Sequence, residues 1–146
     1  MSPSSSSIPL FGDVLARARQ SWVREMAIRL AANGFNDYRL SDALALRWLT
    51  HGAMPFATFT SALGISRQSS RKVVDGLAER DFATIETDRA DARRRNVKLT
   101  SKGQTYATAV IDTLRTINEE LIEKIDPLQL DAAITVLSYV RDNFGD

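Results

Sequence analysis

The 146-residue sequence predicts a mainly α-helical fold with one small β-hairpin. Apolar residues recur at spacings of three and four over most of the chain, which is the period of an amphipathic helix. Between Phe82 and Leu99 the period changes to two, as it does in paired strands. Residues that favour helix ends, such as Ser, Asp, Gly and Pro, separate the periodic stretches and mark where each element begins and ends.

The composition excludes several classes of protein. The chain has no cysteine and one histidine, so we expect no thiol switch, no metal site and no cofactor. It lacks a long apolar run, so we expect no membrane contact. No nucleophile–base pair, carboxylate pair or Gly-rich phosphate loop stands out, and an enzyme is not predicted. Residues 1–7 are Ser-rich and lack a secretory signal pattern, which predicts a disordered tail and a cytoplasmic protein.

The N-terminal part of the sequence predicts three helices. Residues 8–32 carry apolar side chains at helical spacing, and Gly34 beyond them can supply a left-handed cap. A second helix is predicted over residues 41–51. Pro55 then opens a short third helix over Phe56–Leu63, because proline suits the start of a helix and interrupts its interior.

A fourth helix is predicted over residues 67–80. Gly64 permits a tight turn before it, and Ser66 is a strong N-cap candidate. The predicted inward-facing residues of this helix are Ser70, Val73, Val74 and Leu77. Two short helices around a Gly-containing turn form a helix-turn-helix.

The C-terminal part predicts a hairpin and two further helices. Residues 82–88 and 96–100 alternate apolar and polar side chains around a polar tip, which predicts paired strands. Ser101 and the glutamine three residues later resemble a capping box that starts a long helix over 102–124. Asp126 and a following proline start the last helix. Residues 8–146 therefore form a single predicted domain with six helices.

A helix-turn-helix followed directly by a hairpin is a winged helix, in which the second helix of the motif enters the major groove of DNA. The net charge is only +1, but basic residues outnumber acidic ones between Ser66 and Lys98, which indicates a polyanionic partner. The candidate DNA contacts are Arg67, Gln68, Ser69, Arg71 and Lys72 in the fourth helix, and Arg89, Arg93, Arg94 and Arg95 in the hairpin. Strand alternation predicts Arg93 and Arg95 on one face and Arg94 on the other.

The segment "LGISRQSSRKVVDGLAERDFATIETDRADARRRNVKLTSKG" resembles the DNA-binding core of the MarR family of bacterial transcriptional regulators. The residues that match the family pattern are Asp88, Asp91, Arg93, Leu99, Thr100 and Gly103. The resemblance implies that Arg93 enters the minor groove and that Asp91 orients it through an ion pair. The family often carries further arginines where this chain has Ala90 and Ala92, so the identity of the DNA-contacting arginine stays open.

The resemblance also implies a homodimer, with residues 8–36 and 101–146 as dimerisation helices and residues 40–100 as the DNA-binding winged helix. It implies a sequence-specific regulator, most simply a repressor, that binds a pseudo-palindromic operator in double-stranded DNA and is released by a small organic effector. The candidate effector-pocket residues are Trp22, Phe35, Tyr38, Trp48 and His51, although we favour the two tryptophans as core residues. The alternative is an architectural or protein-contacting winged-helix protein without an effector.

Overall fold

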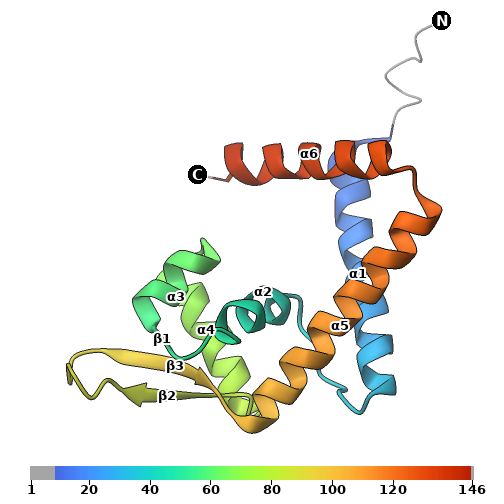
Figure 1. The fold of residues 1–146 in the computed structure, drawn as a ribbon. Helices are drawn as coiled ribbons and strands as arrows, with labels where there is room; N and C mark the ends of the chain where they lie inside the picture. Colours follow the sequence, from blue (N-terminus) through green and yellow to red (C-terminus); the bar gives the residue numbers. More distant parts are fainter. Residues whose placement is uncertain (1–8, 146) are drawn as a thin grey trace, which may run out of the picture. The chain divides into compact units, whose positions relative to one another are not determined.

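The computed structural model describes residues 9–145, and the predicted tail over residues 1–7 lies outside this range. Six helices and three strands are present within it (Figure 1). In chain order they are α1 (Phe11–Ala32), α2 (Leu40–Leu49), β1 (Met54–Pro55), α3 (Phe56–Leu63), α4 (Arg67–Glu79), β2 (Ala83–Thr87), β3 (Arg95–Leu99), α5 (Ser101–Lys124) and α6 (Pro127–Asn143). None of these helices is both long and apolar enough to cross a bilayer.

The predicted class, mainly α-helical with a small β-hairpin wing, is confirmed. The structure adds one strand that the sequence analysis missed. The two-residue strand β1 pairs antiparallel with β3, with Met54 opposite Val97, so the sheet has the order β1-β3-β2. Because β1 makes only two residue pairs with β3, no alternation of apolar and polar residues could reveal it in the sequence.

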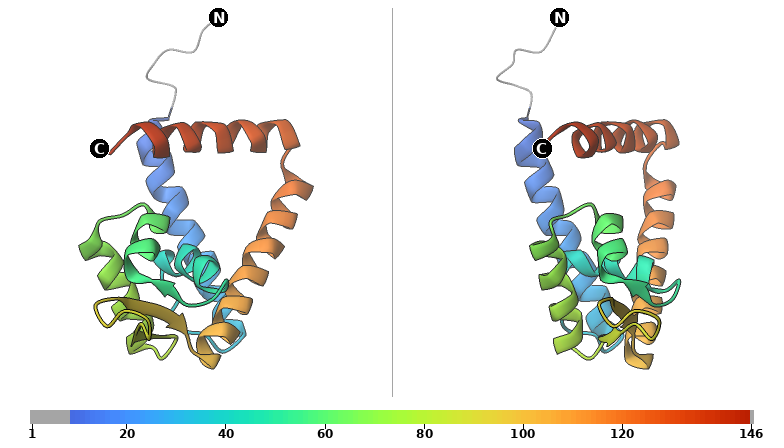
Figure 2. Two further views of the ribbon diagram at one scale, coloured as in Figure 1. Left: turned by 60° about the vertical axis from the view of Figure 1, so that its left-hand side comes forward. Right: turned by 90° about the vertical axis from the view of Figure 1, so that its left-hand side faces the viewer.

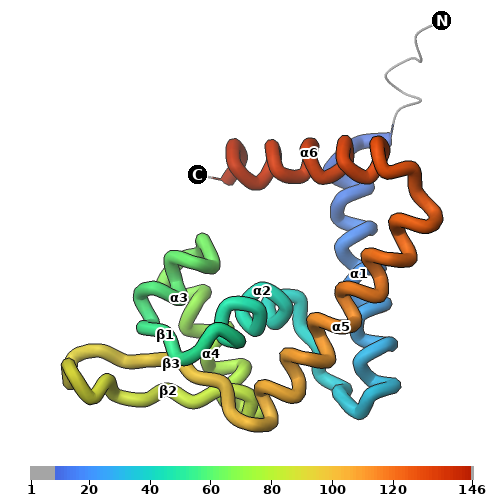
Figure 3. Tube along the Cα trace, in the orientation of Figure 1, coloured from blue at the N-terminus to red at the C-terminus, as the bar shows by residue number. Residues whose placement is uncertain are grey.

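The chain divides into two units, of which the first ends at Ile111 and the second begins at Asp112. The first unit holds the helix-turn-helix and the sheet. Figures 2 and 3 show α3 and α4 side by side, with the β2–β3 hairpin extending from the same part of the unit. Its largest fully buried side chains include Met26, Leu30, Leu46, Leu49, Phe59, Val74, Leu77, Val97, Tyr106 and Val110. This core joins α1 to α5 through the winged helix and gives α4 and the hairpin a rigid support.

The ends of the helices follow the predicted cap residues with one correction. Gly34 adopts a left-handed φ of 89° after α1, as expected. The capping box predicted at Ser101 is wrong, because the side chain of Thr100 caps α5 instead. The Oγ1 atom of Thr100 accepts a 2.9 Å hydrogen bond from the backbone N–H of Gly103. Ser101 is already the first residue of the helix.

The second unit contains the C-terminal part of α5 and the whole of α6. Asp126 caps α6 as predicted, since its carboxylate accepts a 2.8 Å hydrogen bond from the N–H of Leu128. No residue of α6 is buried within one chain. Its exposed apolar side chains include Leu128, Ile134, Val136, Leu137 and Tyr139. These side chains give α6 an exposed apolar surface.

Candidate nucleic-acid interface

The helix-turn-helix is held together by short-range hydrogen bonds around its turn. Gly64 adopts a left-handed φ of 66° between α3 and α4. Ser66 caps α4 by accepting a 3.1 Å hydrogen bond from the N–H of Ser69. Ser70 is fully buried and its hydroxyl accepts a 2.8 Å hydrogen bond from Thr60 of α3. These contacts fix the first turns of α4, where a recognition helix presents its side chains.

The tip of the wing is a compact turn organised by two aspartates. The Asp88 carboxylate accepts a 2.8 Å hydrogen bond from the N–H of Ala90, and Asp91 accepts one of 3.0 Å from the N–H of Arg93. Short polar side chains commonly stabilise turns in this way. The carbonyl of Arg94 accepts a hydrogen bond from the N–H of Asp88 and closes the loop at 2.9 Å. The acidic residues in this basic segment therefore shape its backbone.

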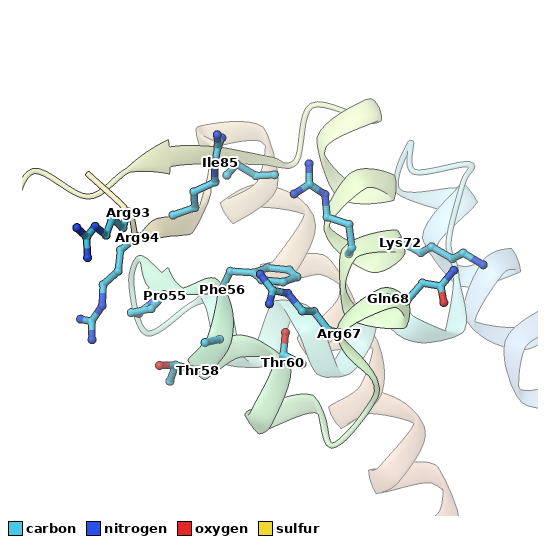
Figure 4. Close-up of a pocket in the computed structure, with 13 residues that line it drawn as sticks. Pro55, Phe56, Thr58, Thr60, Arg67, Gln68, Lys72, Ile85, Arg93 and Arg94 are labelled. Atoms are coloured by element: carbon cyan, nitrogen blue, oxygen red, sulfur yellow. The ribbon is translucent and has the colours of Figure 1, made fainter. Parts of the chain in front are cut away.

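A groove of about 970 Å³ lies between α3, α4 and the wing, and we call it the wing groove (Figure 4). It is lined by Pro55, Phe56, Ala57, Thr58, Thr60, Arg67, Gln68, Arg71, Lys72, Ile85, Arg93, Arg94 and Arg95. In Figure 4, Arg93 and Arg94 extend from the wing near Pro55, while Arg67 extends from α4 over Phe56. Cationic side chains of α4 and the wing thus line the same groove as apolar residues such as Phe56 and Ile85.

Six of the lining residues are cationic, and the ion pairs within residues 9–145 engage only one of them. Arg71 Nε lies 3.1 Å from Asp75 on the next turn of α4, and both side chains are about half exposed. Exposed pairs of this kind contribute little, so Arg71 can exchange its carboxylate partner for a phosphate at small cost. The remaining cations give the groove a positive potential that attracts polyanions.

Seven of the nine predicted DNA contacts line this groove, from α4 and from the wing. Ser69 and Arg89 do not, although both are exposed. The prediction that Arg94 faces away from Arg93 and Arg95 is wrong, because all three line the same groove. The strand begins only at Arg95, so strand alternation does not govern the two preceding residues.

The orienting role of Asp91 stays a prediction. Its carboxylate contacts the backbone N–H of Arg93 at 3.0 Å, and this bond fixes the direction in which the chain leaves the turn. A side chain attached to a fixed backbone samples fewer positions. The expected ion pair between the Asp91 carboxylate and the Arg93 guanidinium is absent from residues 9–145, so the contact through which Asp91 can orient Arg93 is this main-chain hydrogen bond.

The five candidate effector residues differ in their environments. Phe35 packs against Tyr106, with ring centroids 5.1 Å apart, and Tyr38 is buried. Trp22 is half-buried, while Trp48 is 39% exposed and His51 is exposed. The interpretation of the tryptophans as core residues is therefore wrong for Trp48 within one chain, while Trp22 is only partly buried. None of the five lines the wing groove.

A buried polar cluster that was not predicted from the sequence lies at the C-terminal end of α4. Asp42 of α2 is fully buried and its carboxylate receives hydrogen bonds from Arg80 and Tyr106. Burial acts to lower the pKa of Arg80, but the hydrogen bond and charge of Asp42 outweigh it and raise that pKa. Burial, with the Asp42 charge, also raises the pKa of Tyr106. The signal in the sequence was Asp42, an acidic residue within the mostly apolar segment of α2. An aspartate is rarely fully buried unless it is paired, so its position there indicates a buried partner.

Within residues 9–145, no group of three or more His, Asp or Glu side chains is placed to hold a metal ion.

No known family model and no curated protein sequence matches this chain. Solved structures do match over nearly the whole length. BpsR of Bordetella bronchiseptica, whose DNA binding is regulated by 6-hydroxynicotinic acid, is 21% identical with a TM-score of 0.74, covering 99% of this chain and 100% of its own.

Two further solved structures resemble the chain to a similar degree. The PcaV transcriptional regulator of Streptomyces coelicolor, in complex with its natural ligand, is 16% identical with a TM-score of 0.76, and 98% of each chain is covered. A MarR mutant from E. coli, complexed with operator DNA, is 16% identical with a TM-score of 0.71, covering 95% of this chain and 99% of that one. Because the sequence identities are only 16–21%, the similarity to these structures establishes the fold of this chain and nothing further.

Proposed function

We propose that this chain, which has the MarR winged helix-turn-helix fold, is a DNA-binding transcriptional regulator. The observation that carries the proposal is the wing groove, where the first turns of α4 and the wing bring six cationic side chains together. Phosphate contacts from such cations supply most of the affinity for a duplex. Hydrogen-bonding side chains on the recognition helix supply the sequence specificity.

Gln68 and Arg67 are the residues best suited to reading bases. Both are exposed in the first turn of α4, directly after the Ser66 cap. Arginine forms two hydrogen bonds with guanine, and glutamine does so with adenine. Arg93 and its neighbours in the wing suit an adjacent minor groove, because narrow minor grooves attract arginine.

The regulator acts as a homodimer. Apolar side chains are exposed on α1, with Leu10 just before its start at 72%, and on α6, with Phe144 just beyond its end at 63%. Exposed apolar surface of this kind marks a protein interface. A two-fold dimer presents two recognition helices and therefore binds a pseudo-palindromic operator, which suits a repressor that blocks promoter access.

A small organic effector releases the repressor from its operator. Support comes from the likeness in fold to BpsR, whose DNA binding is regulated by 6-hydroxynicotinic acid, and to PcaV, which was solved with its natural ligand. Such an effector must bind the non-DNA-binding state more tightly than the DNA-binding state. A regulator of this kind acts in the cytoplasm, where its DNA is.

Selection of duplexes from a random-sequence pool tests the proposal. The full chain should enrich a family of related, two-fold symmetric sequences, and its affinity for them should fall steeply with salt because counterions are released. A flat plot of log affinity against log salt would exclude DNA as the partner. Binding without sequence enrichment would instead identify an architectural protein, which is the alternative function.

The dimer is tested by light scattering at micromolar concentration. The expected mass is about twice the 16.2 kDa of one chain. Leu137→Glu places a charge on the exposed apolar surface of α6 and should shift the mass toward that of one chain. Thr108→Glu adds the same charge to an exposed site on α5 and should leave the mass unchanged. A wild-type mass near 16.2 kDa would refute the dimer.

A further inference from the structure

Asp42 is the centre of a buried hydrogen-bond cluster that joins three elements of the first unit. Its Oδ2 atom lies 2.7 Å from Arg80 Nη1, and its Oδ1 atom lies 2.8 Å from Arg80 Nη2. The hydroxyl of Tyr106 donates to Oδ2 at 2.7 Å, and the N–H of Arg39 donates to the same atom at 3.1 Å. One carboxylate thus connects α2 to α5 and to the residue that ends α4.

Arg80 is held in place on every side. Its Nε donates to the carbonyl of Gly76 at 2.8 Å, and its Nη1 also donates to the carbonyl of Asp37 at 2.8 Å. Its guanidinium lies 5.4 Å from the centroid of the Phe82 ring. Only 9% of the side chain is exposed. A planar guanidinium with this set of partners is restricted in position.

The aromatic ring of Tyr106 completes the cluster. It stacks on Phe82 with centroids 4.1 Å apart and an interplanar angle of 14°. Phe82 follows α4 closely in the chain, and its N–H donates to the carbonyl of Leu77 at 2.8 Å. The end of α4 is therefore fixed to α5 by ring stacking and to α2 by the ion pair.

Stability alone does not account for a buried ion pair here. Removing two charges from water is unfavourable, and well-packed apolar side chains of the same size often give equal or greater stability. What a bidentate pair adds is geometry, because two parallel hydrogen bonds admit only one relative orientation of the groups. The cluster lies at the C-terminal end of α4, where it can set the orientation of that helix.

We propose that Asp42, acting through Arg80 and Tyr106, is a positioning residue that holds the recognition helix at the angle required to read base sequence. The inference rests on the proposed function, since it names a specificity-determining residue for that DNA interface. Asp42 itself is fully buried, so its effect on DNA must pass through its partners.

The length of α4 explains why its far end must be fixed. The helix has 13 residues and is therefore about 20 Å long. A tilt of about 10° at the Arg80 end moves the first turn by about 3 Å, whereas a hydrogen bond to a base edge tolerates a few tenths of an ångström. Phosphate contacts from long, flexible cationic side chains tolerate such a shift. Loss of positioning should therefore reduce specificity and leave non-specific affinity nearly unchanged.

Three variants of the full chain test the inference. Asp42→Asn removes the charge at the centre, Arg80→Lys keeps the positive charge but loses the bidentate geometry, and Tyr106→Phe keeps the stacked ring but loses one hydrogen bond. The matched control is Arg141→Lys, which makes the same change in a bidentate pair with Asp142 that is exposed on α6. Binding is measured at a temperature at which circular dichroism shows that every variant is folded.

The measurement uses two duplexes, one selected by the wild-type chain and the other a scrambled version of it. The specificity ratio is the dissociation constant for the scrambled duplex divided by that for the selected duplex. We expect Asp42→Asn and Arg80→Lys to reduce this ratio at least about tenfold, and Tyr106→Phe about threefold. The salt dependence of binding to the scrambled duplex should be unchanged, since the cations of the wing groove remain. The control variant should keep the wild-type ratio.

A lower melting temperature with an unchanged ratio in the folded variants would overturn the inference, because it indicates a role in stability alone. If Asp42→Asn does not fold, the other two variants decide the question by the same criterion. A wild-type chain that does not distinguish the two duplexes would overturn the proposed function, and the inference with it.

Discussion

The Cα atom of Gly103, in the first turn of α5, lies against the backbone carbonyl oxygen of Phe82. A Cβ atom at this position would overlap that oxygen. The same oxygen accepts a 3.0 Å hydrogen bond from the N–H of Thr100. The start of α5 and the residue before β2 are therefore in direct backbone contact, which anchors the base of the wing to the core. Position 103 has room for glycine alone.

Gly103→Ala should destabilise the chain by at least about 2 kcal/mol, because backbone has to move to admit the methyl group. Urea unfolding monitored by circular dichroism measures the change. Gly12→Ala is the matched control, since a Cβ at Gly12 meets nothing within 4 Å and alanine favours a helix. Equal effects of the two substitutions would contradict the close contact at Gly103.

Ser66→Ala should lower the free energy of unfolding by about 1 kcal/mol, the usual effect of losing an N-cap. The substitution removes the acceptor of the Ser69 N–H at the start of α4. Ser69→Ala serves as the control, because it keeps that backbone donor and loses only the 2.9 Å contact between the two hydroxyls. The control should change stability by less than half as much. The reverse order would show that the hydroxyl pair, and not the cap, stabilises α4.

The stability of the fold should decrease between about pH 10 and pH 12 because of Tyr38. Burial, and after it the negative charge of Asp42, raises the pKa of Tyr38 from 10.0 to about 12. The folded chain holds this proton more tightly than the unfolded chain does. The stabilisation that protonated Tyr38 gives the fold is therefore complete below about pH 10 and is lost as the pH rises through 12. The total loss of folding free energy from this group is limited to about 2–3 kcal/mol.

Urea unfolding of the wild type and of Tyr38→Phe across this range isolates the effect. The phenylalanine variant should lose less stability than the wild type as the pH rises, although ionisation of Tyr106 will still contribute. Parallel curves for the two proteins would show that Tyr38 does not titrate in this range.

Arg93→Ala should reduce affinity for a selected duplex by at least about 1–2 kcal/mol, as expected for an arginine in a DNA groove. Mobility-shift titration measures it. Arg115→Ala is the control, since Arg115 is exposed on α5 and paired with Asp112 outside the wing groove. Unchanged affinity of the Arg93 variant would exclude it as the groove arginine.

Asp91→Ala should weaken binding by less than Arg93→Ala does, because it frees the turn that presents the arginine. If Asp91 acts only by orienting Arg93, the double variant should bind about as weakly as Arg93→Ala alone. Independent, additive losses in a double-mutant cycle would show that Asp91 contributes in another way.

Local sequence patterns were enough to predict the six helices, the two strands of the hairpin and the cationic residues that line the wing groove. The Ser66 cap, the left-handed Gly34 and the short α3 were predicted because each depends on residues within one or two turns. The cations of α4 and the wing were also predicted, since charge clustered along the chain is visible without a structure.

Packing between distant segments decided the rest. The pairing of Met54 with Val97 creates a third strand, and the late start of β3 at Arg95 brings Arg94 into the wing groove. Asp42 meets Arg80 across 38 residues and Tyr106 across 64. Periodicity shows which face of a helix is buried, but the partners on that face depend on how helices cross and where each strand begins. For that reason only the folded chain shows the Asp42 carboxylate bonded to Arg80 at the end of α4.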